Sequence, residues 1–281
     1  MYKKYNVIFN EFKKIGLFHY LTGIMLQIAI LLSFYNILSL STQTIMPIFM
    51  CKNPDNLETH KCTLEEICNK SIIKQIDLDE SVWNWTMKFE LYCGREYFIK
   101  VLTSSLFISS IFSMLVISVL SDRFGRLYAF RLLLTFTLIG YLMVFSEYNL
   151  VVIYIGVVTC YLFNQLYAIS IVYLNEFFPQ NIYSYLVLSQ NIVGGCFGLL
   201  VNLFADYFRQ VRGLLTILLI LNLLAILFSF FMMTESPDWL IKKYENDHEY
   251  LDKQLLKNYK YISKINRYGE EDLENFENLL T

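Results

Sequence analysis

Long stretches of the chain are continuously apolar and are separated by short polar turns. A helix that rises 1.5 Å per residue needs about 20 such residues to cross a hydrocarbon core roughly 30 Å thick. Six stretches reach or nearly reach that length, with a single charge, Arg131, near the start of the third. They cover residues 15–50, 101–120, 127–145, 150–174, 182–205 and 213–234. The pattern predicts an all-α, polytopic membrane protein with six membrane-spanning helices.

Composition agrees with this fold class and excludes others. Of the 281 residues, 56% are hydrophobic and only 17% are charged, whereas soluble domains carry about 25% charged residues. A net charge of -2 lacks the basic footprint of a nucleic-acid-binding protein. No nucleotide-binding, zinc-protease or hydrolase motif is present. We therefore expect the lipid bilayer as a partner, no nucleic acid, no cofactor, no metal and no enzymatic activity.

The distribution of Lys and Arg predicts the orientation of the spans. Basic residues gather before the first span, around the turn between the second and third, and after the sixth. With six spans all three groups fall on one side, which the positive-inside rule makes cytoplasmic. Residues 1–14 and 235–281 are then cytoplasmic, and the spans lie in the plasma membrane or an endomembrane. Leu251, Leu255, Leu256 and Tyr259 have helical spacing, which predicts one or two short helices in the tail.

The segment from 51 to 100 is a long external loop that contains four of the six cysteines. Cys51, Cys62, Cys68 and Cys93 predict two disulfides, with three pairings possible. A zinc site formed by His60, Cys62 and Cys68 is an alternative, although the usual closely spaced cysteine pairs are absent. Two glycosylation sequons begin at Asn69 and Asn84. The loop is therefore expected to face the secretory pathway.

The turn after the second span concentrates charge around a glycine. Asp122, Arg123, Gly125 and Arg126 lie within five positions. Such a turn fits a tight bend in which guanidinium groups form forked pairs with carboxylates. An ordinary positive-inside turn is the alternative.

These features resemble the major facilitator superfamily, in particular its organic cation, anion and carnitine transporter branch. The resemblance rests on the run Ser121-Asp122-Arg123-Phe124-Gly125-Arg126, the external cysteine loop with its approach from Trp85 to Cys93, and Glu235-Ser236-Pro237-Asp238-Trp239-Leu240. The segment 261–266 is also similar. The resemblance implies one six-span half of a twelve-span fold, in which the substrate binds between two halves. The other half would come from a second chain, a homodimer or further sequence.

Several positions depart from the pattern of this branch. Ser118 replaces a glycine, Leu127 and Asp238 replace basic residues, and Tyr183 and Gly156 replace arginines. The charge network that the resemblance implies therefore lacks several of its cations.

The remaining charges predict a cluster at the cytoplasmic ends of spans two to six. Its members are Asp122, Arg123, Arg126, Glu176 and Glu235. We expect Arg123 or Arg126 to pair with Glu176 or Glu235 and to hold the bundle in one shape. Solvated charges at helix ends, each pair contributing about 0–1 kcal/mol, are the alternative.

Within the spans the polar residues are mostly amides and hydroxyls, which should point into the bundle because facing lipid is costly. Candidates for substrate contact are Asn36, Asn164, Gln165, Tyr167 and Gln190. Hydrogen bonding between helices is the alternative role.

Two functions compete. The first is transport of a small organic ion together with a second half, and the second is a non-transporting membrane scaffold or complex subunit.

Overall fold

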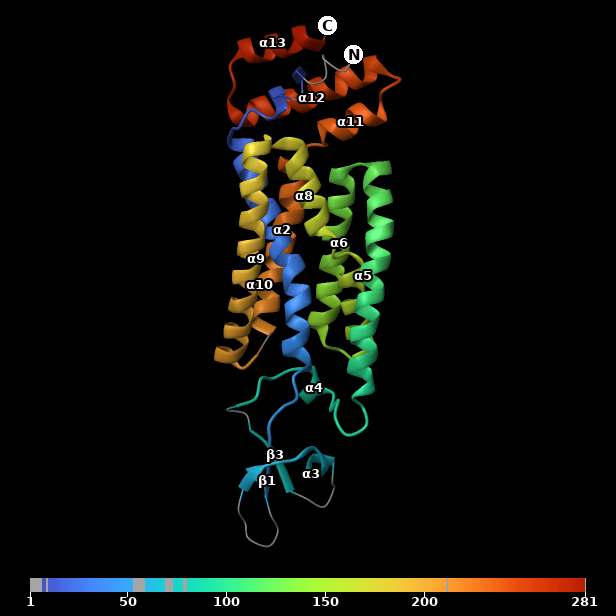
Figure 1. The fold of residues 1–281 in the computed structure, drawn as a ribbon, viewed down its shortest axis with the longest axis vertical. Helices are drawn as coiled ribbons and strands as arrows, with labels where there is room; N and C mark the ends of the chain where they lie inside the picture. Colours follow the sequence, from blue (N-terminus) through green and yellow to red (C-terminus); the bar gives the residue numbers. More distant parts are fainter. Residues whose placement is uncertain are drawn as a thin grey trace.

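The computed structural model describes residues 7–8, 10–52, 59–68, 73–77, 80–210 and 212–280. Six helical spans form an upright bundle (Figure 1), which confirms the predicted fold class. They are α2 (Leu17–Thr44), α5 (Tyr97–Phe124), α6 (Arg126–Ser146), the pair α7 (Leu150–Leu162) and α8 (Leu166–Phe177), α9 (Gln180–Phe208), and α10 (Arg212–Met232).

The first span is shorter than predicted. The sequence predicted an uninterrupted helix as far as residue 50, but α2 ends at Thr44, and Ile45 has an extended backbone with ψ 135°. Pro47 explains the early end, because a proline disfavours helical geometry in the residue before it and donates no backbone hydrogen bond. Strand β1 (Phe49–Lys52) then begins within the apolar stretch.

The fourth span is interrupted near its middle. Helix α7 ends at Leu162, and α8 begins at Leu166 after a break at residues 163–165. The break contains Asn164, whose short amide competes for backbone hydrogen bonds and lowers helix propensity. The prediction of a continuous helix over 150–174 was therefore wrong, although both segments remain in one candidate span.

Helix α2 lies at the centre of the bundle and packs against α8, α9 and α10, while α6 packs closely on α7. At the α6–α7 crossing, a Cβ on Gly140 would lie 2.8 Å from the carbonyl oxygen of Gly156. The hydroxyl of Tyr141 donates to the carbonyl of Leu32 at 2.9 Å, which joins α6 to α2. Helices α9 and α5 stand at the left and right edges of the bundle in the view of Figure 1.

The loop between α2 and α5 contains a small sheet that the sequence did not predict. Strands β2 (Thr59–Lys61), β1 and β3 (Ile73–Ile76) pair antiparallel in the order β2-β1-β3, with Cys51 opposite His60. Two short helices accompany the sheet, α3 (Leu64–Cys68) and α4 (Trp85–Lys88). The two predicted disulfides are present, joining Cys51 to Cys62 and Cys68 to Cys93. Because these sulfurs are bonded to each other, the zinc alternative with His60 is wrong.

The two sequons differ in what the structure shows. Asn69 lies outside the described residues. Asn84 is only 3% exposed, and its side-chain nitrogen donates to the carbonyls of Thr42 at 3.2 Å and Ile45 at 2.8 Å. A glycan on that nitrogen would have to displace these contacts, so the folded geometry opposes glycosylation of Asn84.

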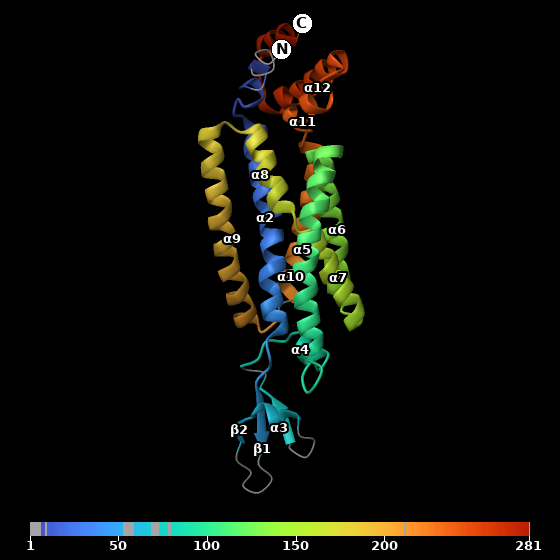
Figure 2. The ribbon, with the colours of Figure 1, turned by 45° about the vertical axis from the view of Figure 1, so that its right-hand side comes forward.

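Three helices follow the sixth span, whereas the sequence predicted one or two. They are α11 (Pro237–Lys243), α12 (His248–Asn266) and α13 (Glu270–Leu280). Both chain termini lie at the same end of the bundle, opposite the sheet (Figures 1 and 2). We name these the terminal end and the loop end. At the terminal end the ring of Phe12 contacts those of Tyr259 and Phe276 at 5.7 and 5.6 Å.

Candidate functional site: a charged turn at the terminal end

A single residue, Gly125, separates α5 from α6. Its backbone angles are φ 115° and ψ 156°, a conformation that is essentially restricted to glycine. A Cβ at this position would also lie 2.8 Å from the carboxyl carbon of Glu235. The turn therefore needs glycine for two reasons, its backbone conformation and the close approach of Glu235.

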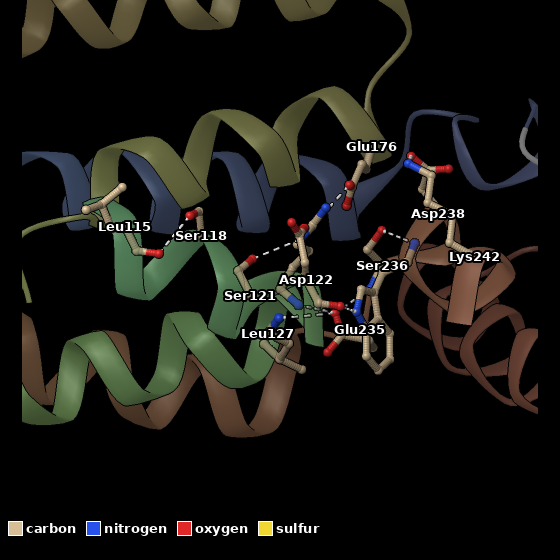
Figure 3. Close-up of polar contacts among 12 residues, drawn as sticks. Leu115, Ser118, Ser121, Asp122, Leu127, Glu176, Glu235, Ser236, Asp238 and Lys242 are labelled. Carbon is tan, nitrogen blue, oxygen red and sulfur yellow. Dashed lines mark hydrogen bonds and ion pairs between the residues drawn. The ribbon is translucent and has the colours of Figure 1, made fainter. Parts of the chain in front are cut away.

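Glu235 caps the first turn of α6 from a distant part of the chain (Figure 3). Its Oε1 accepts backbone N–H groups from Arg126 at 2.9 Å, Leu127 at 3.1 Å and Ser236 at 3.0 Å. A glycine at the N-cap offers no side-chain acceptor, so the free N–H groups and positive dipole end of α6 favour an external carboxylate. Burial raises the pKa of Glu235 above its ordinary value, because it outweighs these three hydrogen bonds.

Arg126 joins three elements through its guanidinium. It pairs with Asp122 on α5, donates to the hydroxyl of Ser121 at 3.1 Å, and donates from Nε to Oε1 of Glu176 on α8 at 3.3 Å. The side chains of Arg126 and Glu176 are only 12% and 5% exposed. The predicted pairing of Arg126 with Glu176 is confirmed.

Two parts of the predicted cluster behave differently. Glu235 accepts backbone N–H groups of the turn, whereas the sequence predicted that it would pair with a guanidinium. Arg123 is exposed and forms no ion pair with another described residue. Its guanidinium lies 5.8 Å from the centre of the Phe124 ring.

The tail is attached to the same turn by residues that the sequence analysis did not select. The indole Nε1 of Trp239 donates to the carbonyl of Asp122 at 2.8 Å, and Asn258 donates to the carbonyl of Glu235 at 3.0 Å. Ser236 caps α11 by accepting the backbone N–H of Trp239 at 3.3 Å, and Pro237 occupies the first turn. A Ser-Pro helix start directly after Glu235 is the sequence signal that could have located this joint.

The described candidate substrate residues lie in the break of the fourth span, on α8 and on α9. Gln165, in the break of the fourth span, lines a pocket of about 280 Å³ that also includes Asp122 and Arg126. Tyr167 donates its hydroxyl to Oδ1 of Asn191 at 3.0 Å. Gln190 is fully buried, and its amide has no hydrogen-bond partner among the described residues. Asn164 lies beside Gln165 in the break, and the side chain of Asn36 lies outside the described part of the structure.

A six-span helical bundle whose second and third spans meet at a charged glycine turn defines a polytopic membrane protein. The chain belongs to the Major Facilitator Superfamily, which matches residues 78–267, more than half of the sequence. Members of this superfamily are transporters. The match includes the charged turn, the broken fourth span and the first two tail helices. No curated protein matches the sequence.

Proposed function

We propose that this chain transports a small organic ion across the membrane and does so together with a second six-span half. The supporting observation is a polar strip on α9 at the depth of the bilayer. Asn191 and Asn202 are exposed well inside this span. Amides facing hydrocarbon are costly, so this side of α9 should contact protein or a water-filled path.

The neighbouring residues are suited to an organic ion. Tyr167 on α8 is bonded to Asn191, and its ring lies edge-on to Phe34 of α2 at 6.2 Å. Aromatic faces attract organic cations, and an amide beside them can orient a polar group. The break at residues 163–165 interrupts the fourth span between two helical segments, and interrupted spans occur at binding sites in other transporters.

The orientation follows the same proposal. The basic residues Arg123, Lys242 and Lys243 all lie at the terminal end, which we therefore place in the cytoplasm. The disulfide-bonded sheet at the loop end then faces an oxidising compartment.

Uptake of radiolabelled tetraethylammonium into vesicles carrying the protein tests the proposal. We expect saturable uptake when a second half is present, by dimerisation or as a partner chain. Tyr167→Phe should lower it because the contact with Asn191 is lost. Tyr185→Phe removes the hydroxyl of a residue that is 75% exposed and should leave uptake unchanged. If vesicles carrying either variant take up no more tetraethylammonium than empty vesicles, the proposal is contradicted.

The extensive attachment of the tail favours a second candidate, a membrane scaffold. Trp239 and Asn258 bind the charged turn, and Tyr268 donates to the carbonyl of Lys14 at 2.9 Å, so the terminal end forms one platform. Purification in a complex of fixed stoichiometry, without uptake of any organic ion, would favour this function over transport.

A further inference from the structure

An apolar pocket of about 270 Å³ lies at the loop end, between the first turns of α5 and α7 and beneath α4. Its inner wall is closed by Leu91, Leu102 and Ile153, which are 4%, 7% and 1% exposed. None of its lining residues is charged. Such a cavity excludes water and accepts an apolar ligand.

The mouth of the pocket opens sideways from the bundle. Phe98, Val101 and Val151 line it and are 38%, 51% and 65% exposed. All three belong to the first turns of candidate membrane spans. The mouth therefore lies near the membrane interface, where head groups give way to acyl chains.

A second pocket, of about 420 Å³, adjoins the first and carries a positive charge. The two share Leu91, Phe98 and Leu150, and the second adds Phe89 and Arg95. Arg95 is exposed, lies two residues before α5 begins, and forms no ion pair with another described residue.

The nearby charges leave Arg95 available for a ligand. Lys88 is held by Glu147, with Nζ 2.7 Å from the carboxylate. Glu90 and Glu96 are close in sequence, but neither lines the two pockets.

The order of chemistry along the two pockets matches that of a membrane lipid. A cation lies at the depth of the head groups, and an uncharged apolar cavity lies directly beneath it. A guanidinium forms forked, charge-assisted hydrogen bonds with phosphate. We infer that the loop end binds one phospholipid of the surrounding leaflet, with an acyl chain between α5 and α7 and its phosphate at Arg95. The bilayer supplies this ligand because the mouth opens at membrane depth.

Photocrosslinking tests this site in the intact protein. The probe is phosphatidylcholine with a diazirine on one acyl chain, incorporated into vesicles that contain the protein. We expect crosslinks, located by peptide mass spectrometry, in segments 98–102 and 150–154. Val151→Trp fills the mouth and should reduce those crosslinks roughly tenfold, because the acyl chain loses several buried methylene contacts. Arg95→Gln should reduce them severalfold through loss of the phosphate contact.

Matched controls separate the site from general contact with lipid. Val119→Trp alters a valine that is also 65% exposed but lies on α5 near the end remote from the pocket, and it should leave the labelling unchanged. Arg209→Gln removes a different cation at the loop end and should also have no effect. Equal labelling of Val151→Trp and wild type overturns the inference. Competition by free oleate but not by unlabelled phosphatidylcholine overturns the choice of ligand. If a protein partner covers the mouth, the wild type shows no crosslinks there, which also refutes it.

Discussion

The two ends of the bundle are held together in different ways. At the terminal end, polar contacts join elements far apart in sequence: Glu235 to the start of α6, Arg126 to Glu176, and Trp239 to Asp122. At the loop end, both disulfides close within the loop itself, with sequence separations of 11 and 25 between their cysteines. Covalent bonds therefore stiffen the loop and leave the spans free, whereas reversible contacts join the spans.

This difference is physically useful to a transporter of this superfamily. In the proposed transport function, one half rocks against the other largely as a rigid body, so contacts within this half should keep its shape. The hydrogen bonds and ion pairs at the terminal end join its spans in this way. The disulfides keep the loop folded in either state without restricting the spans.

The largest effect is expected from Gly125→Val at the terminal end. The variant must place a branched side chain at φ 115° and displace the Glu235 carboxylate from three backbone donors. We expect destabilisation by more than about 4 kcal/mol, combining backbone strain with lost hydrogen bonds. Thermal unfolding in detergent measures the effect. Gly195→Ala is the control, because a Cβ there meets nothing within 4 Å, and its stability should be unchanged or slightly higher.

Arg126→Ala comes next. The substitution leaves Glu176, which is 5% exposed, without its cation, and breaking a buried pair in this way costs about 3–5 kcal/mol. Arg123→Ala removes an equal charge from the same turn but no ion pair between described residues, so its effect should stay within about 0.5 kcal/mol. Similar unfolding temperatures for the two variants would contradict the assigned roles.

Reduction of the disulfides should affect only the loop end. Opening both crosslinks should destabilise the sheet by about 3 kcal/mol per closed loop through loss of the chain constraint. Limited proteolysis after treatment with dithiothreitol should cleave between residues 52 and 93 while the unfolding temperature of the bundle stays constant. A large fall in that temperature would show that the loop does support the spans.

The smallest effect concerns pH. The pKa of Glu235 is raised in the folded protein above its ordinary value of 4.5, so the fold favours its protonated form. Stability should therefore fall as pH rises from about 4.5 through the raised pKa. Glu235→Gln should show less of this fall, whereas Glu271→Gln, an exposed position, should retain it in full. Unfolding temperatures measured between pH 4 and 7 provide the test. If the wild type instead gains stability relative to Glu235→Gln as the pH rises, the expected direction of the pH dependence is wrong.

The length and uniformity of the apolar stretches made the spans predictable, and four of them agree with the helices to within a few residues at each end. The first span was misjudged because its apolar stretch continues past Pro47 into β1, and hydrophobicity alone cannot distinguish a buried strand from a helix. The break at Asn164 was missed for a similar reason, since the surrounding residues remain apolar.

The candidate site was predictable in its membership more than in its geometry. Charge and position at the ends of the spans identified Arg126, Glu176 and Glu235. Opposite charge then suggested guanidinium pairing for Glu235, whereas the structure uses it to cap the backbone of α6. That contact depends on how closely α10 and the turn at Gly125 approach each other, which no local pattern encodes. The same limit applies to Trp239 and Asn258.

The joint between α2 and β1 has a practical consequence. Only residues 45–48 separate helix from strand, and Asn84 holds the carbonyls of Thr42 and Ile45 on the helix side of that connection. A tilt of the central helix α2 should therefore move the disulfide-bonded sheet with it. A nanobody or fluorophore attached to the sheet would then report, from outside the lipid, how α2 moves during a transport cycle.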